Sequence, residues 1–189
     1  TQKEAEQFKQ HGINTRAEII PNGIYLQSYE RNGSTLAETL GLPKGEKTLL
    51  FLSRLHPKKG LDILINAFAA FVTTTPGVTL VIAGGDAGTG YVTEVKEMLR
   101  EYDIQSRVRM IGEVRGNEKI QTLLGADAFV LSSYSEGLPV AVVEAMGASL
   151  PVIITYDCNI PEVQEWDAGY VVHPDAGEVS KAMKELFSD

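Results

Sequence analysis

The sequence has few of the features that mark secreted, metal-binding or membrane-spanning chains. Its 189 residues include a single cysteine, Cys158, so no intramolecular disulfide can form, which fits a reducing compartment. The three histidines are scattered, and no Cys/His set has the spacing of a zinc site. No apolar run approaches the roughly 20 residues of a membrane span. No signal peptide is visible and the first residue is Thr, so we expect a piece of a longer protein.

Positive charge is scarce as well. Lys and Arg number 17 against 25 Asp and Glu, which gives a net charge of −8. A surface of this charge repels polyanions, so nucleic acid is not an expected partner, and any phosphate site has to be a local basic cluster. A Walker loop, a Gly-x-Ser-x-Gly elbow and an Asp-x-Asp pair are also missing. We therefore expect no metal ion held by paired carboxylates.

Short apolar runs alternate with helix-length segments from residue 48 onward, and a hydrophobic content of 43% predicts a packed core. The predicted strands cover residues 48–53, 78–83, 107–111, 128–131, 151–155 and 169–172. The predicted helices cover residues 60–73, 91–102, 117–124, 139–148 and 176–187. Nearly continuous apolar strands separated by crossovers indicate the α/β class. We predict one doubly wound, Rossmann-like domain, with a mostly parallel sheet of about six strands and helices on both faces.

The first 47 residues follow another pattern. A short amphipathic helix is predicted over 3–11, a short strand over 16–20, a turn at Pro21-Asn22-Gly23 and a short helix over 36–40. The sequence has no internal repeat and no low-complexity tract.

Two glutamates follow the fourth predicted strand. Glu136 lies in a loop with Ser, Tyr and Gly, whereas Glu144 lies within the otherwise apolar segment 140–146. A helix that is apolar all round is usually buried, and an ionised carboxylate there costs several kcal/mol unless it has a partner. No Lys or Arg lies within a helical turn or two of Glu144. Either a distant Lys or Arg pairs with it, or the hydroxyl groups of a ligand do.

A basic cluster follows the first predicted strand. Arg54 comes directly after the strand, and Lys59 lies just before a helix. Ligands bind beyond the carboxyl ends of parallel strands. Guanidinium and ammonium groups at that edge suit a diphosphate, because Arg grips phosphate oxygens two at a time and Lys adds a compact charge. A solvated basic loop is the alternative, and it is the usual fate of such clusters.

The start of the helix after Glu136 predicts a second anion contact. Gly137 lets the backbone approach a ligand closely, and Pro139 suits the first helical position. The amides of Gly137, Leu138 and Val140 then point out of a helix N-terminus that carries about half a positive charge. An acidic residue at a helix start is also an ordinary cap, so Glu136 alone would mean little.

Taken in order, these motifs resemble the C-terminal, donor-binding half of retaining GT-B glycosyltransferases of the group 1 class, family 4. The resemblance is carried by Arg54, Lys59-Gly60, Gly84-Gly85, Gly112, the segment 132–146 with its two glutamates, 151–152 and 159–162. The turn at 21–23 resembles the segment where such chains cross from the N-terminal to the C-terminal domain. The resemblance therefore covers almost the whole chain, and the order and spacing of the motifs make it specific.

The resemblance implies a role for each motif around a bound UDP- or GDP-sugar. Arg54 and Lys59 would hold the diphosphate. Glu144 would accept hydrogen bonds from the ribose, and Glu136 would contact the transferred sugar. The implied binding residues are Arg54, Lys59, Gly84, Gly112, Val114, Glu136, Gly137, Leu138, Pro139 and Glu144, of which Arg54, Lys59 and Glu136 are also the implied catalytic residues.

The resemblance also implies the chemistry and the setting. Transfer would retain the configuration of the sugar and need neither a metal nor a cofactor besides the donor substrate. Residues 1–20 would be a remnant or linker of a missing N-terminal domain, and residues 21–189 the donor-binding domain. Because the missing domain would hold the acceptor, we expect the chain by itself to turn over little or nothing. The implied location is cytoplasmic, with any peripheral contact to a membrane made through the missing half.

The sequence also bears on three other functions of an α/β domain. The glycine-rich run 84–90 does not match G-x-G-x-x-G, because position 93 is Thr93, and this argues against a dehydrogenase. The run predicts a tight turn, with a close approach to a donor sugar as the alternative. A nucleotide-sugar epimerase would need its own acid/base pair, and the sequence has no convincing one. A non-catalytic module that binds nucleotide sugars stays open.

Overall fold

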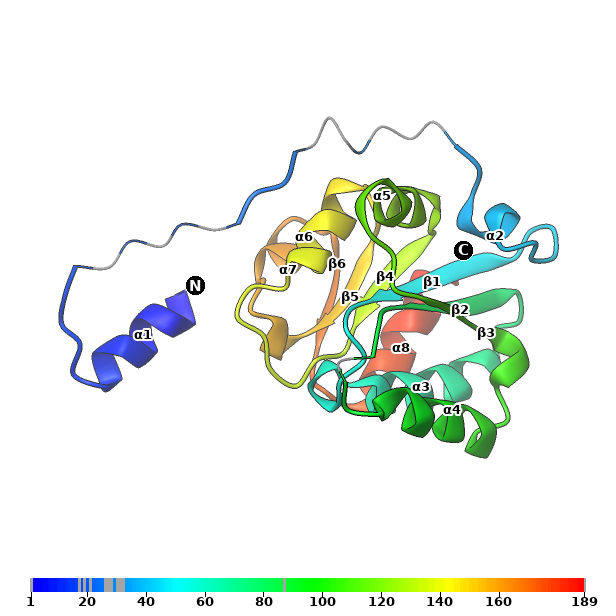
Figure 1. Cartoon of the computed structure of the whole chain (residues 1–189), viewed down its shortest axis with the longest axis horizontal. Helices are drawn as coiled ribbons and strands as arrows, with labels where there is room; N and C mark the ends of the chain where they lie inside the picture. The colour runs from blue at the N-terminus through cyan, green and yellow to red at the C-terminus, as the bar shows by residue number, and fades with distance from the viewer. Residues whose placement is uncertain are drawn as a thin grey trace.

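The computed structural model forms a six-stranded sheet in which all neighbouring strands are parallel (Figure 1). The strands are β1 Lys47–Leu52, β2 Val78–Ala83, β3 Val108–Gly112, β4 Ala128–Leu131, β5 Val152–Thr155 and β6 Gly169–Val172. The structure describes the whole chain except Thr1, Ala17, Ile19, Pro21, residues 26–28, residues 30–32, Ala87 and Asp189.

The strand order is β3-β2-β1-β4-β5-β6. The chain builds outward from β1 through β2 and β3, then returns to the other side of β1 with β4. Leu49 lies beside Ala128, and Leu50 beside Phe129, at this central pairing. An open α/β sheet leaves a crevice at the carboxyl end of such a reversal, because the two connecting segments leave in opposite directions. The crevice between β1 and β4 is therefore the expected place for a ligand.

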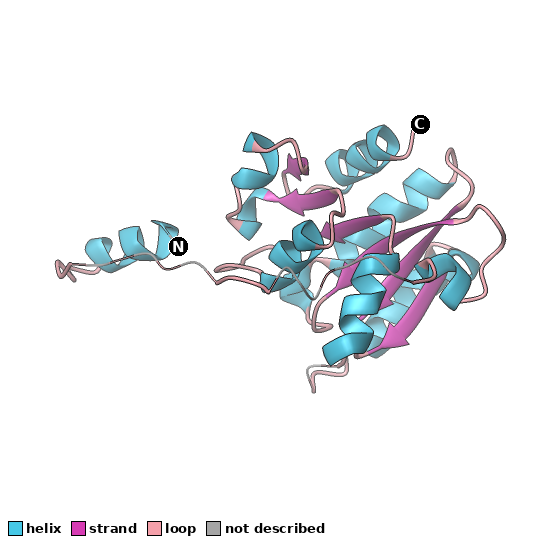
Figure 2. Cartoon of the chain, turned by 90° about the horizontal axis from the view of Figure 1, so that it is seen from above, coloured by secondary structure: helices cyan, strands magenta, loops and turns pink. Residues whose placement is uncertain are grey.

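Helices cover both faces of the sheet (Figures 1 and 2). Figure 1 shows α3, α4 and α8 on one face and α5, α6 and α7 on the other. The bounds are α1 Gln2–Gln10, α2 Leu36–Thr39, α3 Leu61–Val72, α4 Tyr91–Glu101, α5 Gly116–Gly125, α6 Val140–Gly147, α7 Glu162–Glu165 and α8 Ala176–Leu186. The described residues also contain the 3-10 turns η2 Pro57–Lys59, η3 Gln105–Arg107 and η4 Tyr156–Cys158.

The core beneath α3 and α8 is aromatic. Phe51 of β1 and Phe68 and Phe71 of α3 are fully buried. The ring of Phe71 lies 5.8 Å from that of Phe187, which directly follows α8. Aromatic side chains bury on the order of 150–250 Å² each. These rings therefore pack α3 and α8 against each other and against the sheet.

The predicted α/β architecture is confirmed. All six predicted strands are present, and β2, β4 and β6 have the predicted bounds. The five helices predicted after residue 48 are present with ends that differ by at most one residue, which is within the usual uncertainty of helix assignment. The helix α7 and the three 3-10 turns were not predicted, because segments of three or four residues carry no measurable periodicity.

The N-terminal part agrees less well. The predicted helices over 3–11 and 36–40 correspond to α1 and α2, and α2 begins with a capping box between Thr35 and Glu38. The predicted strand over 16–20 is wrong where it can be checked, since Arg16, Glu18 and Ile20 belong to no strand. Positions 17 and 19, and Pro21 of the predicted turn, lie outside the described residues.

Ser149 ends α6 in a conformation that usually requires glycine. Its φ of 59° lies in the left-handed region. The amide of Ser149 donates to Met146 O (2.9 Å), and the amide of Leu150 donates to Ala145 O (3.0 Å). These two bonds form a Schellman motif, in which a residue with a Cβ is strained. The chain therefore carries a local cost at Ser149.

We predict that Ser149→Gly stabilises the protein. Removing the Cβ relieves left-handed strain worth about 1 kcal/mol, which for a domain of this size raises Tm by roughly 2–4 °C. Thermal unfolding followed by circular dichroism measures the shift. Ser149→Ala keeps the Cβ and is the control, with no gain expected. An unchanged or lower Tm in the Gly variant contradicts the assignment of strain to this position.

Candidate functional site

The loops that follow β1 and β4 are in direct contact at the carboxyl edge of the sheet. Ser132 Oγ donates to Gly60 O (2.7 Å), and the amide of Tyr134 donates to Lys58 O (2.9 Å). Gly60 has a φ of 67°, and a Cβ built there would lie 1.9 Å from Ser132 O. Only glycine fits such an approach of two backbones. This contact brings the basic loop after β1 beside the loop that carries Glu136.

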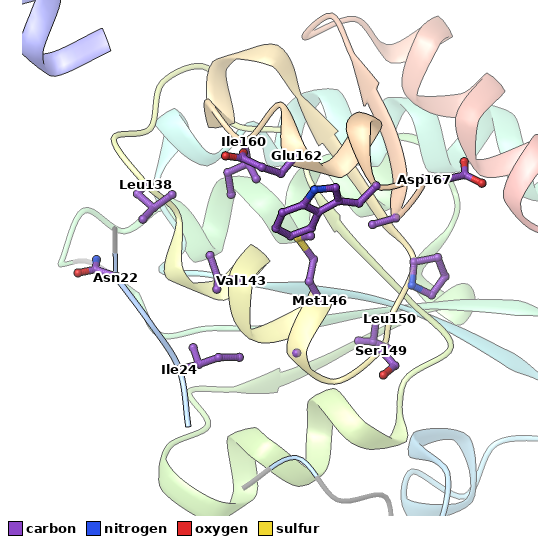
Figure 3. Close-up of a pocket in the computed structure, with 14 residues that line it drawn as sticks. Asn22, Ile24, Leu138, Val143, Met146, Ser149, Leu150, Ile160, Glu162 and Asp167 are labelled. Atoms are coloured by element: carbon purple, nitrogen blue, oxygen red, sulfur yellow. The ribbon is translucent and has the colours of Figure 1, made fainter. Parts of the chain in front are cut away.

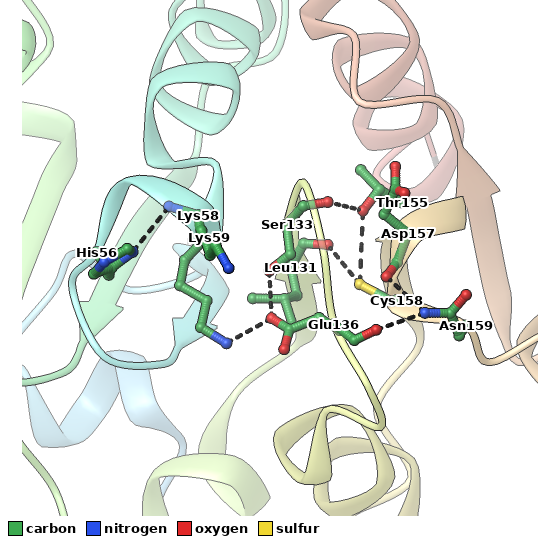
Figure 4. A network of polar contacts seen from close by, with 10 residues as sticks. All are labelled: His56, Lys58, Lys59, Leu131, Ser133, Glu136, Thr155, Asp157, Cys158 and Asn159. Atoms are coloured by element: carbon green, nitrogen blue, oxygen red, sulfur yellow. Dashed lines mark hydrogen bonds and ion pairs between the residues drawn. The ribbon is translucent and has the colours of Figure 1, made fainter. Parts of the chain in front are cut away.

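Glu136 is held by two side chains (Figure 4). Lys59 Nζ and Ser133 Oγ each lie 2.6 Å from its Oε1. The side chains of Lys59 and Glu136 are only 16% and 10% exposed. A charged pair this buried persists because each charge offsets the desolvation of the other. Two predicted site residues, Lys59 and Glu136, are therefore in contact.

Glu144 has a partner from another helix. Lys119 Nζ of α5 lies 2.5 Å from Glu144 Oε1, and Glu144 is 9% exposed. Of the two alternatives left open by the sequence, a distant cation is the one observed. Burial, followed by the charge of Glu144 and a hydrogen bond with it, raises the pKa of Tyr29. Tyr29 therefore also lies against this carboxylate.

Lys119 was not found from the sequence. It precedes Glu144 by 25 positions and lies on the helix that follows β3. The exposed Gly112, with a φ of 78°, is the last residue of β3, and the buried Val114 lies in the loop that leads into that helix. Two implied binding residues and the partner of the buried glutamate thus come from one stretch of chain. Periodicity could not reveal this, because the contact depends on how α5 packs against α6.

Arg54 differs from the two lysines. It is exposed at the end of β1, and within the described part of the chain its side chain makes no ion pair or hydrogen bond. Lys59 and Lys119 are each committed to a glutamate. A guanidinium at this edge is thus open to an anionic ligand, and it can bind two oxygens at once.

Backbone packing alone explains why position 84 is a glycine. A Cβ at Gly84 would lie 1.8 Å from Ser53 O, and its amide donates to Gly112 O (2.7 Å). The amide of Leu55 donates to Gly85 O (2.9 Å). These contacts fasten the ends of β1, β2 and β3 to one another. Tight packing of neighbouring strand ends therefore accounts for Gly84.

The N-terminus of α6 differs from the prediction by one residue. The helix begins at Val140, and Pro139 is the N-cap residue, with no side chain capping the helix. Gly137 is exposed, Leu138 is half-buried and Pro139 is buried. Leu138 faces a groove of about 820 Å³ along α6 and α7 (Figure 3). Its side chain therefore lines this groove, and its backbone amide is the group available to an anion.

The described residues lack the features of a metal centre and of a membrane span. They contain no group of three or more His, Cys, Asp or Glu side chains that could hold a metal ion. Within the same residues, no helix has both the length and the apolar character that crossing a bilayer requires.

The comparison with known families is decisive at this point. Residues 34–189 match the family model described as glycosyl transferases group 1. The chain belongs to this family. The predicted resemblance is thereby confirmed, and the sheet described above is the C-terminal, Rossmann-like half of a GT-B fold.

Two curated relatives illustrate the match. The alpha-monoglucosyldiacylglycerol synthase of Streptococcus pneumoniae is 32% identical over 147 residues, which are 75% of this chain and 33% of that protein. The D-inositol 3-phosphate glycosyltransferase of Nocardia farcinica is 30% identical over 143 residues, 73% of this chain and 32% of that protein. The chain spans about a third of the length of these relatives.

Solved structures agree on the fold. HepE of Anabaena in complex with UDP is 27% identical, with a TM-score of 0.86 over 100% of this chain and 53% of that one. WaaG, a glycosyltransferase of lipopolysaccharide biosynthesis, gives 0.85 at 19% identity over 100% and 52%. The C-terminal domain of LpcC from Francisella tularensis gives 0.79 at 22% identity, and there the match covers 88% of this chain and 89% of that chain. The group 1 domain here therefore corresponds to one half of the two-domain structures.

We predict that Lys119→Met destabilises the protein, because it leaves the Glu144 carboxylate buried without a cation. The expected loss is about 1–3 kcal/mol in urea unfolding. Lys58→Met is the matched control, since Lys58 is exposed and its side chain makes no ion pair among the described residues. That variant should stay within about 0.5 kcal/mol of the wild type. Adding Glu144→Gln to Lys119→Met should recover most of the loss, and equal stability of the two single lysine variants would contradict the pair.

Cys158 is buried close to Glu136, and we predict that its thiol is unreactive in the folded protein. Burial raises the pKa of its thiol to about 11, with the charge of Glu136 adding to the shift and Thr155 opposing it. The thiolate is the reactive form, so at pH 8 the folded protein should react with an aromatic disulfide reagent at least about 100 times more slowly than the unfolded chain. Absorbance of the released thiol measures both rates. Rapid labelling of the folded protein would contradict the burial of this side chain.

Proposed function

We propose that this chain is the donor-binding half of a retaining group 1 glycosyltransferase and that it binds a UDP- or GDP-sugar at the crevice between β1 and β4. The observation that carries the proposal is the arrangement of charge there. The open Arg54 and the pairs Lys59–Glu136 and Lys119–Glu144 come from four different segments of the chain. Although the net charge of the chain is −8, these three cationic side chains and two carboxylates lie at the carboxyl edge of the sheet. This set suits a ligand that carries both phosphates and hydroxyl groups.

Arg54 and Lys59 are the proposed diphosphate ligands. The exposed guanidinium of Arg54 can take two phosphate oxygens, and the Lys59 ammonium lies where it can contact a phosphate while still facing Glu136. The free amides at the start of α6, among them those of Gly137 and Leu138, add partial positive charge. These groups would also stabilise the charge that grows on the leaving diphosphate as the sugar departs.

Glu144 is the proposed ribose ligand. Lys119 holds the carboxylate in place, and a carboxylate is a strong acceptor for two neighbouring hydroxyl groups. The pairing uses Oε1, and the other oxygen can accept a hydrogen bond from the ribose. The loop from Gly112 to Val114 leads into the helix that carries Lys119, so the base is proposed to lie against that loop.

Glu136 is the proposed sugar contact, with Gly84 and Pro139 in the wall around it. The carboxylate is fixed by Lys59 and Ser133, so it can accept a sugar hydroxyl and support positive charge at the anomeric carbon. We do not propose that Glu136 acts as a general base. The leaving phosphate takes the proton of the acceptor on the same face of the sugar, which retains its configuration.

Residues 1–20 are proposed to belong with a preceding N-terminal domain, and residues 21–189 form the donor-binding domain. Apolar side chains of this first part are exposed, with Ile13 at 47% and Ile20 at 85%, and Tyr25 just after it at 84%. Exposed apolar groups gathered in one segment mark a surface that another part of a protein covers. The acceptor would bind to that N-terminal domain, so the chain alone should bind donor and turn over little.

A panel of UDP-glucose, GDP-mannose and ADP-glucose in thermal unfolding tests the proposal. A ligand at about 100 times its Kd adds roughly 2.7 kcal/mol of stability, and we expect the shift with one nucleotide. HepE of Anabaena was solved with UDP, which makes UDP-glucose the first compound to test. Arg54→Ala should abolish the shift and Glu144→Gln should weaken it, whereas Arg100→Ala, an exposed arginine of α4, is the control. A folded protein that responds to none of the three would refute the proposal.

Metal independence is tested in the same assay. EDTA should leave the shift produced by the nucleotide sugar unchanged, because Arg54 and Lys59 supply the positive charge for the diphosphate. Strict dependence on added Mg²⁺ or Mn²⁺ would contradict this mechanism.

A further inference from the structure

Hydrogen bonds join the loop that carries Glu136 to the segment at the end of β5 and just after it (Figure 4). The amide of Glu136 donates to Asp157 O (2.9 Å). Thr155 Oγ1 donates to Ser133 O (2.5 Å), and Asn159 Nδ2 donates to Glu136 O (2.6 Å). Both backbone polar groups of Glu136 are therefore bonded to one neighbouring loop, while its carboxylate is held by side chains on the other side.

Asn159 has a backbone conformation that glycine would adopt more easily. Its φ of 55° and ψ of 40° are left-handed, at the end of the turn η4. Asn is among the few residues with a side chain that tolerate this region. A glycine would thus satisfy the backbone, and what the asparagine adds is its side-chain amide. Both contacts of that amide, Glu136 O at 2.6 Å and Asp157 O at 3.1 Å, are to carbonyl oxygens, so it acts as a donor.

We propose that Asn159 is a positioning residue that holds Glu136 in place to recognise the sugar of the donor. The inference rests on the function proposed above for Glu136. Asn159 acts through the main chain: its amide fixes the carbonyl of Glu136, and Ser133 and Lys59 then fix the carboxylate of a residue whose backbone cannot shift. A misplacement of about 1 Å at a reacting group is costly, so a loose loop would weaken the contact of Glu136 with the sugar.

The nucleotide should depend on Asn159 much less than the sugar does. Arg54 lies just after β1. Glu144 lies within α6 and is paired with Lys119. Neither bonds to the loop after β5 in the described part of the chain. Loss of the Asn159 amide should therefore reduce the affinity gained from the sugar while that for the nucleotide diphosphate stays.

The test compares Asn159→Gly and Asn159→Asp with the wild type. Gly keeps the left-handed backbone and removes the amide, and Asp keeps the shape and replaces the donor by an acceptor. Asp103→Gly is the matched control, because Asp103 has a φ of 53° and follows α4, at the other end of the sheet. Hydrogen exchange of the Glu136 amide is measured without ligand, and calorimetry gives Kd for UDP, UDP-glucose, GDP and GDP-mannose.

We expect the Glu136 amide to exchange roughly tenfold faster in both Asn159 variants, as loss of one such bond suggests, and at the wild-type rate in Asp103→Gly. Kd for the diphosphate should stay within about twofold, while the sugar nucleotide loses most of its advantage over it. Wild-type behaviour of Asn159→Asp in both measurements overturns the inference, because the backbone shape alone would then suffice. An equal loss for diphosphate and sugar nucleotide overturns it too. A wild type that binds none of the four compounds refutes the proposed function instead, and the inference falls with it.

Discussion

The approach of Gly60 to Ser132 is the constraint on which the rest of the site depends. These two backbones come so close that no side chain fits between them, and the contact lies where β1 and β4 diverge. It sets the distance between the loop of Arg54 and Lys59 and the loop of Glu136. A Cβ at position 60 would push the two loops apart, and the buried Lys59–Glu136 pair would lose its geometry before any residue that touches a ligand had changed. The position of a glycine thus determines the electrostatics of the crevice.

Charge in the crevice is balanced by contacts between elements. Each glutamate is paired with a lysine from another segment, so in the ligand-free protein neither carboxylate is buried alone. Lys59 and Lys119 each face a glutamate, whereas the guanidinium of Arg54 makes no ion pair within the described part of the chain. A bound diphosphate would meet a positive field that the negative net charge of the whole chain does not suggest. Local arrangement outweighs overall composition here.

The fold could be predicted from the sequence because apolar runs and crossovers repeat at regular intervals, and strands such as Val78–Ala83 were found with their observed bounds. Glu136 and Lys59 could be singled out because strand ends of a parallel sheet share one edge. The partner of Glu144 could not be found, since Lys119 reaches it through the packing of two helices. The glycine-rich run 84–90 predicts a tight turn, but not the backbone contact with Ser53 that is enough to require Gly84. Asn159 begins the segment 159–162, which carries part of the resemblance, but the sequence does not show that its side-chain amide bonds to Glu136. These contacts depend on distances between packed elements, and the pattern of residues along the sequence does not determine those distances.

The central pairing of β1 with β4 also bears on how the protein reaches its native state. The hydrogen bond from the Thr48 amide to Asp127 joins residues 79 positions apart, and the strands beside it are joined across the same interval. Closing so long a loop is entropically costly, so such pairings form slowly compared with local helices. The crevice exists only once this pairing is complete. Partly folded forms therefore lack a binding site altogether. A ligand would bind only the native state and so stabilise the protein against unfolding.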